Sequence, residues 1–345
     1  MGAVTSLVLV LIDDFDYELP DERIAQTPIE PRDAARLLVD RGSAPPEHRH
    51  VHDLPELLRE GDLLVLNETR VIPARLRLHR STGGAAEVLL LEPWDADRRT
   101  WDALVRPGGK LRVGELLYRD DTPLVRVGER TPAGDTFWVE LVGDDDPVEL
   151  LDRYGEMPLP PYIGERLADP DRYQTVFARE PGSAAAPTAG LHFTQGLFDR
   201  LADAGVRTAK VELAVGLDTF QPISTDDPLE HPMHTERYRV PPETMVACRE
   251  AGRVVAVGTT AVRALESAAG SGDLSGRTDL FIHRGFDWQV VDMMMTNFHL
   301  PKTTLLMMVD AFVGPRWRTL YEIALADDYR FLSFGDAMLL DRHVR

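Results

Sequence analysis

The sequence predicts an α/β protein whose main domain is interrupted by an inserted β domain, and three observations support this prediction. The 345 residues exceed what one hydrophobic core usually holds, so two domains are expected. Residues 73–148 run in short apolar bursts separated by turn residues, which is typical of a small barrel or sandwich. From residue 151 onward the pattern alternates strand, loop and helix, which favours an α/β sheet.

The chain before the insertion contains three expected elements. Residues 7–12 form an apolar run that is too short to span a membrane and lacks the basic start of a signal peptide, so we expect a strand or an overlong start site. Residues 53–55 are expected to open a helix that Gly61 ends. Residues 63–66 follow as a strand.

The insertion is expected to contain six strands and a basic stretch. Residues 70–112 hold nine Arg or Lys against five Asp or Glu, whereas the whole chain has a formal net charge of −19. That net charge argues against a protein that binds nucleic acid over its whole surface. It leaves two alternatives open for the basic stretch, which can contact nucleic acid locally or consist of strand residues that only face solvent. The expected strands cover residues 74–78, 87–91, 101–105, 116–118, 124–127 and 137–141.

Strands and helices are expected to follow one another after the insertion. Alternating residues 209–215 and the β-branched burst 254–257 predict two strands, the second of them buried and parallel. Helices are expected after Thr194 and after Thr260. A further helix over residues 305–313 is closed by Gly314. Since Cys248 is the only cysteine, an intrachain disulfide and a cysteine-rich zinc site are excluded, and a reducing compartment fits best.

Three loops have the residue types of a binding site. Residues 186–194 (APTAGLHFT), 258–260 (GTT) and 296–301 (TNFHLP) each lead into an expected helix. Loops of this kind gather at the carboxyl ends of strands, where unpaired helix amides lie beside their side chains. We expect them to hold a carboxylate, hydroxyl groups and an aromatic ring. A Gly-Thr-Thr can be an ordinary helix cap and a lone histidine can be structural, but His192 and His299, each beside a phenylalanine, favour a site.

A fourth segment, residues 230–236, places two histidines between two acids. It can be an acid-base cluster or a polar loop, and a metal site is disfavoured because no HExxH spacing is present and a proline interrupts any helix. No glycine-rich dinucleotide fingerprint and no P-loop lysine motif occurs, which argues against a dehydrogenase, a P-loop hydrolase and the usual methyltransferase.

Taken in order, these motifs resemble the S-adenosylmethionine:tRNA ribosyltransferase-isomerases of queuosine biosynthesis. The resemblance implies an α/β fold in which a mixed-sheet α/β/α domain is interrupted by an inserted antiparallel six-stranded β-barrel, with boundaries at residues 1–72, 73–148 and 149–345. The motifs include DFDYELP (14–20), DLLVLNETRVIPAR (62–75), MPLPPYI (157–163), APTAGLHFT (186–194), MHTE (233–236), AVGTTAVRALES (256–267), TNFHLPKTTL (296–305), YRF (329–331) and FGDAM (334–338).

The resemblance also implies a reaction. The ribosyl part of S-adenosylmethionine, a consumed co-substrate, is transferred to 7-aminomethyl-7-deazaguanine at the wobble position of tRNA, giving epoxyqueuosine and releasing adenine and methionine. No metal is implied, no membrane is involved, and a cytoplasmic monomer is expected. A noncatalytic tRNA-binding module and a divergent S-adenosylmethionine enzyme with a small-molecule acceptor are the alternatives.

The family's chemistry implies roles for three sets of residues. The catalytic set is His192, His234, Glu236 and His299. The set expected to bind S-adenosylmethionine is Thr188, Ala189, Gly190, Phe193, Gly258, Thr259, Thr260, Arg263, Asn297 and Phe298. The set expected to bind tRNA is Asn67, Thr69, Arg70, Arg75, Arg77 and Arg80. The chain departs from the family pattern at Ala214 and Asp218, where a histidine and a glycine are usual, and at His283-Arg284, where Tyr-Pro is usual.

Overall fold

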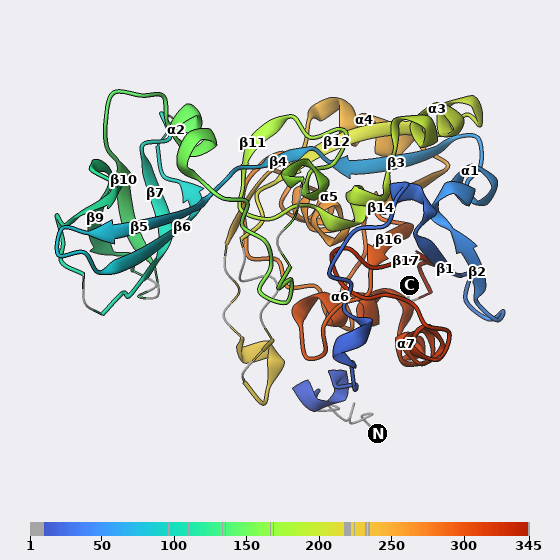
Figure 1. Ribbon diagram of the computed structural model, residues 1–345. Coiled ribbons are helices and arrows are strands. Elements are labelled where there is room, and N and C mark those ends of the chain that lie inside the picture. The colour runs from blue at the N-terminus through green and yellow to red at the C-terminus, as the bar shows by residue number, and fades with distance from the viewer. Residues whose placement is uncertain are drawn as a thin grey trace, which may run out of the picture.

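In the computed structural model, a large α/β domain lies beside a small β-barrel (Figure 1). The structure describes residues 10–95, 97–109, 111–132, 134, 136–165, 167, 169–216, 222–223, 225–231, 233 and 235–343. Residues 7–9 of the strand expected at residues 7–12 therefore lie outside the described residues, and Ile12 begins the 3-10 helix η1 (Ile12–Phe15) instead. Within the described ranges, no helix has both the length and the apolar character needed to cross a membrane.

The α/β domain is built on one nine-stranded sheet with the order β15-β13-β12-β3-β14-β16-β17-β1-β2. Its four middle strands, β12, β3, β14 and β16, run parallel to one another. Strands β13 and β17 are antiparallel to their inner neighbours, so the sheet is mixed, and the expected fold class is confirmed. The strands are β1 (Arg36–Asp40), β2 (Glu47–His50), β3 (Asp62–Asn67), β12 (Arg207–Leu213), β13 (Glu236–Arg239), β14 (Arg253–Val257), β15 (Ser275–Thr278), β16 (Met293–Asn297) and β17 (Ala337–Asp341).

Helices cover both faces of this sheet because its central strands are apolar on both sides. Leu63 and Val65 of β3 belong to one hydrophobic cluster, which includes residues of α5 and α6. Leu64 and Leu66 belong to a second cluster, which includes residues of α1 and α3. The helices of the domain are α1 (Leu54–Leu57), α3 (Gln195–Asp203), α4 (Pro242–Glu250), α5 (Thr259–Ser271), α6 (Thr304–Val313) and α7 (Arg316–Ala326).

The inserted domain is a closed barrel of six antiparallel strands in the order β10-β7-β6-β5-β8-β9, so the expected six-stranded barrel is confirmed. Helix α2 (Pro147–Tyr154) and the paired strands β4 (Thr69–Val71) and β11 (Glu180–Ser183) lie between the barrel and the large sheet (Figure 1). The barrel strands are β5 (Arg75–Arg80), β6 (Ala85–Pro93), β7 (Thr100–Arg106), β8 (Leu116–Arg119), β9 (Thr122–Arg130) and β10 (Phe137–Leu141).

Two helices differ from the expectation. The helix expected to run to Gly61 is the single turn α1, because Leu58 already has an extended backbone. The helix expected over residues 305–313 is α6, which begins one residue earlier than expected, at Thr304. It cannot extend further back because Lys302 has φ +55, which a helix cannot accommodate. At its start, the side chain of Thr303 accepts a hydrogen bond from the Leu306 amide.

Candidate active site

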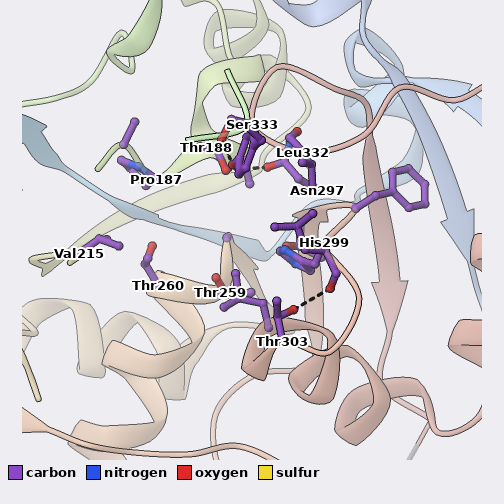
Figure 2. Close-up of a pocket in the computed structure, with 18 residues that line it drawn as sticks. Pro187, Thr188, Val215, Thr259, Thr260, Asn297, His299, Thr303, Leu332 and Ser333 are labelled. Atoms are coloured by element: carbon purple, nitrogen blue, oxygen red, sulfur yellow. Dashed lines mark hydrogen bonds between the residues drawn. The ribbon is translucent and has the colours of Figure 1, made fainter. Parts of the chain in front are cut away.

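A cavity opens where the three predicted loops meet (Figure 2). Two of these loops follow the carboxyl ends of the neighbouring parallel strands β14 and β16, and the third contains the 3-10 helix η6 (Thr188–His192), which follows β11. Segments far apart in the sequence thus share one cavity. It is lined by Tyr162, Ala186, Pro187, Thr188, Ala189, Val215, Gly258, Thr259, Thr260, Thr296, Asn297, Phe298, His299, Leu300, Thr303, Leu305, Leu332 and Ser333.

The N-terminus of α5 supplies polar groups to this cavity. Its N-cap is Gly258, which has φ +87 and offers no side-chain oxygen to the first helix amides. The helix was expected after Thr260 and starts at Thr259, two residues earlier than the sequence suggested. The Thr260 Oγ1 atom is buried and has no hydrogen-bond partner within the described part of the chain. Uncapped helix amides beside a free hydroxyl make this corner suitable for an anion.

His299 lines the cavity from the loop after β16 (Figure 2). Its Nε2 atom is 2.9 Å from the hydroxyl oxygen of Thr296, and the residue is 8% exposed. Burial lowers the pKa of His299 to about 3. The imidazole is therefore uncharged at neutral pH.

Asn297 separates His192 from the cavity. The Asn297 Oδ1 atom accepts a hydrogen bond from Thr188 Oγ1 at 3.0 Å, and the Nδ2 atom lies 3.3 Å from His192 Nε2. His192 is 4% exposed and does not line the cavity. Burial and the positive charge of Arg330 lower the pKa of His192 to about 4. Of the two loop histidines, only His299 faces the space that a ligand would occupy.

Glu236 and Arg263 form a buried ion pair with each other at the edge of the large sheet. Each residue is 6% exposed, and neither lines the cavity. The Arg263 Nε atom also donates to the Leu280 carbonyl at 3.2 Å. Burial lowers the pKa of Arg263 to about 10, so the guanidinium stays charged at neutral pH. The structure thus joins a residue predicted for catalysis to one predicted for ligand binding, outside the cavity wall.

The two predicted aromatic residues occupy different places. Phe298 lines the cavity and packs edge-on against Tyr321, with 5.4 Å between ring centroids. Phe193 is fully buried on the face of the sheet covered by α1 and α3, where it stacks on Phe198 at 5.2 Å. Gly190 also lies outside the lining, and a side chain there would collide with Phe177.

The residues predicted to bind tRNA fall into three groups. Asn67 and Thr69 are buried and bind the Leu213 carbonyl, so they connect strands rather than face solvent. Arg77 and Arg80 on β5 are held by carboxylates, with the Arg77 Nε atom 2.8 Å from Glu156 and the Arg80 Nε atom 2.6 Å from Glu115.

The third group is Arg70 and Arg75, which line, together with Arg77, a cavity at the junction between the two domains. Arg70 is exposed and has no ion-pair partner among the described residues. The Arg75 Nε atom is buried, and no hydrogen-bond partner for it occurs in the described ranges. Ile163 lines this junction cavity, whereas the preceding residue, Tyr162, lines the cavity of the three loops.

Several predicted positions cannot be placed or stand apart from the cavity. His234 and Asp218 lie outside the described residues. Ala214 donates its amide to the Arg237 carbonyl at 3.0 Å and does not line the cavity, although its neighbour Val215 does. One group of potential metal ligands occurs in the described part of the chain, His50, His52 and Asp53, and it is not part of the cavity.

Tyr162 and Ser333 form a wall of the cavity that was not predicted from the sequence, and their hydroxyl oxygens are 2.7 Å apart. Tyr162 belongs to the MPLPPYI motif and Ser333 lies between the YRF and FGDAM motifs, so these motifs were the available signal. Nothing in their spacing predicts that two segments 171 residues apart meet at one site.

Comparisons with known proteins place this chain among similar sequences over nearly its full length. A family model described as queuosine biosynthesis protein matches residues 12–340. An S-adenosylmethionine:tRNA ribosyltransferase-isomerase from Symbiobacterium thermophilum is 52% identical over 342 residues, which cover 95% of this chain and 99% of the relative. The enzyme of the same name from Moorella thermoacetica is 52% identical over 343 residues, with the same shares. The crystal structure of S-adenosylmethionine tRNA ribosyltransferase from Thermotoga maritima matches with a TM-score of 0.54 and 39% identity, covering 95% of this chain and 99% of that one.

Proposed function

This chain belongs to the queuosine biosynthesis protein family, and we propose that the cavity at the ends of β14 and β16 is where it binds S-adenosylmethionine. The protein is an S-adenosylmethionine:tRNA ribosyltransferase-isomerase, which transfers and isomerises a ribosyl group in queuosine biosynthesis. The proposed acceptor is the aminomethyl group of 7-aminomethyl-7-deazaguanine at the wobble position of tRNA. The products are then epoxyqueuosine in tRNA, adenine and methionine.

The observation that carries this proposal is the anion-binding corner at the start of α5. The methionine part of S-adenosylmethionine ends in a carboxylate, which helix amides and a free hydroxyl bind well. Thr260 provides such a hydroxyl within the cavity, next to the uncapped amides after Gly258. Thr188, Ala189, Asn297 and Phe298 line the same space and are proposed to contact the nucleoside.

His299 is the proposed catalytic group within the cavity. A sulfonium makes the neighbouring C5′ hydrogens acidic, so a base within reach can begin the reaction by removing one of them. Because His299 is uncharged at neutral pH, it does not repel the sulfonium cation and keeps a lone pair for a proton. A bound carboxylate nearby raises the pKa of an imidazole, which brings a buried histidine closer to the range of a general base.

The remaining predicted catalytic residues are proposed to act from the edges of this site. His234 lies two residues before Glu236, whose carboxylate is held by Arg263. That buried ion pair fixes Glu236 at the start of β13. His192 is proposed to act through Asn297, with which it shares a hydrogen bond.

We place the approach of tRNA at the junction cavity beside the barrel. Arg70 and Arg75 line that cavity, and the chain around residues 162–163 separates it from the proposed S-adenosylmethionine site. Arginines without carboxylate partners are available to bind phosphates. A nucleotide extruded from the anticodon loop would then pass over a short stretch of chain to reach the proposed S-adenosylmethionine site. The protein is proposed to act as a cytoplasmic monomer without a metal ion.

The test is to incubate the protein with S-adenosylmethionine and tRNA that carries the precursor base, then measure adenine release and the mass of the modified nucleoside. Adenine is expected only when the precursor-bearing tRNA is present, and tRNA without the precursor is the control. Binding of tRNA without adenine release would identify a binding module instead. Adenine release that does not need tRNA would identify a small-molecule acceptor.

A further inference from the structure

We propose that Tyr17 and Tyr321 are positioning residues that hold His299 in place, because their hydroxyl groups bind both main-chain polar groups of that residue. The Tyr17 hydroxyl donates to the His299 carbonyl oxygen at 2.5 Å. The His299 amide donates to the Tyr321 hydroxyl oxygen at 2.9 Å. The inference rests on the proposed function, in which His299 acts on the substrate.

The loop that carries His299 lacks the hydrogen bonds of regular structure. It connects the end of β16 at Asn297 to Thr304, the first residue of α6. Its other main-chain groups are also bound by distant segments, since the Leu332 amide donates to Phe298 at 3.2 Å and the Lys302 amide donates to Phe15 at 2.9 Å. Buried main-chain groups need partners, so the two tyrosines take the place that a ladder or helix would otherwise fill.

The hydroxyl groups are themselves fixed by packed rings. Tyr321 is 1% exposed, and its ring meets that of Tyr17 edge-on at 5.1 Å. Phe298 and Phe331 pack against Tyr321 at 5.4 Å and 5.9 Å. Burial raises the pKa of both tyrosines, so each hydroxyl keeps its proton at any working pH.

Tyr17 and Tyr321 reach His299 from different parts of the chain. Tyr17 lies in the N-terminal segment, which is also held to the His299 loop by ion pairs from Lys302 to Asp13 at 2.8 Å and to Asp16 at 3.0 Å. Tyr321 lies on α7. Because the N-terminal segment and α7 bind the main chain of His299 from different sides, the imidazole keeps its hydrogen bond to Thr296 and its orientation toward the cavity.

The experiment removes one hydroxyl group at a time by Tyr17→Phe and Tyr321→Phe, and it measures kcat and KM for S-adenosylmethionine with precursor-bearing tRNA. The matched control is Tyr329→Phe. Tyr329 is as buried as Tyr321, and its ring centroid lies 5.7 Å from that of Phe298. Its hydroxyl oxygen, however, lies 2.9 Å from His48 Nδ1 and is not one of the two that bind His299. We expect kcat to fall about tenfold in Tyr321→Phe and several-fold in Tyr17→Phe, with KM changed less than about twofold, because misplacing a reacting group costs rate rather than binding.

A second measurement follows the His299 ring itself by 15N NMR of labelled histidine. In the native protein, burial keeps this ring neutral down to low pH, and a loosened loop hydrates it, so its titration midpoint should rise in Tyr321→Phe but not in Tyr329→Phe. The inference is overturned if both test variants match Tyr329→Phe in kcat and in the His299 signal. Full activity of His299→Ala would instead overturn the proposed role of His299, while the NMR result would still decide the positioning. If Tyr321→Phe fails to fold, the half-buried Tyr17 carries the test.

Discussion

Polar side chains are buried in the cavity of the α/β domain, whereas on strand β5 of the barrel Arg77 and Arg80 are paired with carboxylates. In the cavity, Thr260 is buried in the first turn of α5, and His299 is buried in the loop between β16 and α6. On the barrel, Arg77 and Arg80 lie on strand β5 and are bound by the carboxylates of Glu156 and Glu115.

This difference shows where a polar side chain is informative. Burying a polar group without a hydrogen-bond partner costs free energy, so such a group points to a ligand whose hydrogen bond offsets that cost. An exposed ion pair contributes little energy and forms wherever opposite charges meet on a surface. The cavity residues therefore support a specific site, whereas Arg77 and Arg80, which are paired with carboxylates, indicate no partner by themselves.

The strongest test of the cavity is His299→Ala. If its imidazole takes part in proton transfer, kcat should fall by roughly 10³-fold, which is within the range for a lost acid-base group. His192→Ala is the internal comparison, because that ring lies behind Asn297, and we expect a loss of less than about tenfold. Adenine release gives both rates. An equal loss of kcat in the two variants would show that His299, which lines the cavity, is no more important for the reaction than His192, which does not.

The same two histidines should make stability depend on pH. Their folded-state pKa values, about 4 for His192 and about 3 for His299, are below the value of about 6.5 in the unfolded chain. The unfolded state then binds more protons, so the free energy of unfolding should fall as pH drops from about 6.5 toward 4, by up to about 1.4 kcal/mol per pH unit for each histidine. Urea unfolding of His192→Asn should show a smaller pH dependence by one such contribution. An unchanged slope would mean that His192 binds a proton as readily in the folded protein as in the unfolded chain.

Much of the fold could be predicted because its signals are local. The burst at residues 254–257 and the six bursts of the insertion each correspond to one strand, since apolar runs between turn residues leave few other structures. Thr259, Thr260, Asn297 and His299 could be predicted as a group, because they follow the ends of two adjacent parallel strands.

Other parts of the site depend on tertiary packing that leaves no local pattern. Tyr17 and Tyr321 meet at His299 only after the N-terminal segment and α7 have docked. Glu236 and Arg263 find each other because β13 and β15 extend the sheet beside α5, and spacing alone suggested separate roles for them. For this reason sequence reasoning identified which residue types form the site better than which of them face the ligand.

Thr260→Val sharpens the comparison at the level of one hydroxyl group. The change keeps the shape of the side chain and removes only Oγ1, which has no partner among the described residues. If that atom binds the carboxylate of S-adenosylmethionine, KM for this substrate should rise about tenfold, as expected for one hydrogen bond to a charged group, while kcat changes little. Thr260→Ser retains the hydroxyl and should remain near the native KM. An unaltered KM in Thr260→Val would place the carboxylate elsewhere.

The smallest expected effect concerns the barrel side, where the comparison is between free and paired arginines. Arg70→Ala or Arg75→Ala should weaken tRNA binding about three- to tenfold and reduce the slope of log K against log salt by about one, because each removes a proposed phosphate contact. Arg80→Ala is the matched control, since Glu115 already holds its guanidinium in two hydrogen bonds, and we expect less than about a twofold change. Filter binding over a range of salt concentrations measures all three. If Arg80→Ala weakened binding as much as Arg70→Ala, then tRNA would displace Glu115, and an ion pair in the free protein would no longer be a reason to discount an arginine as a contact.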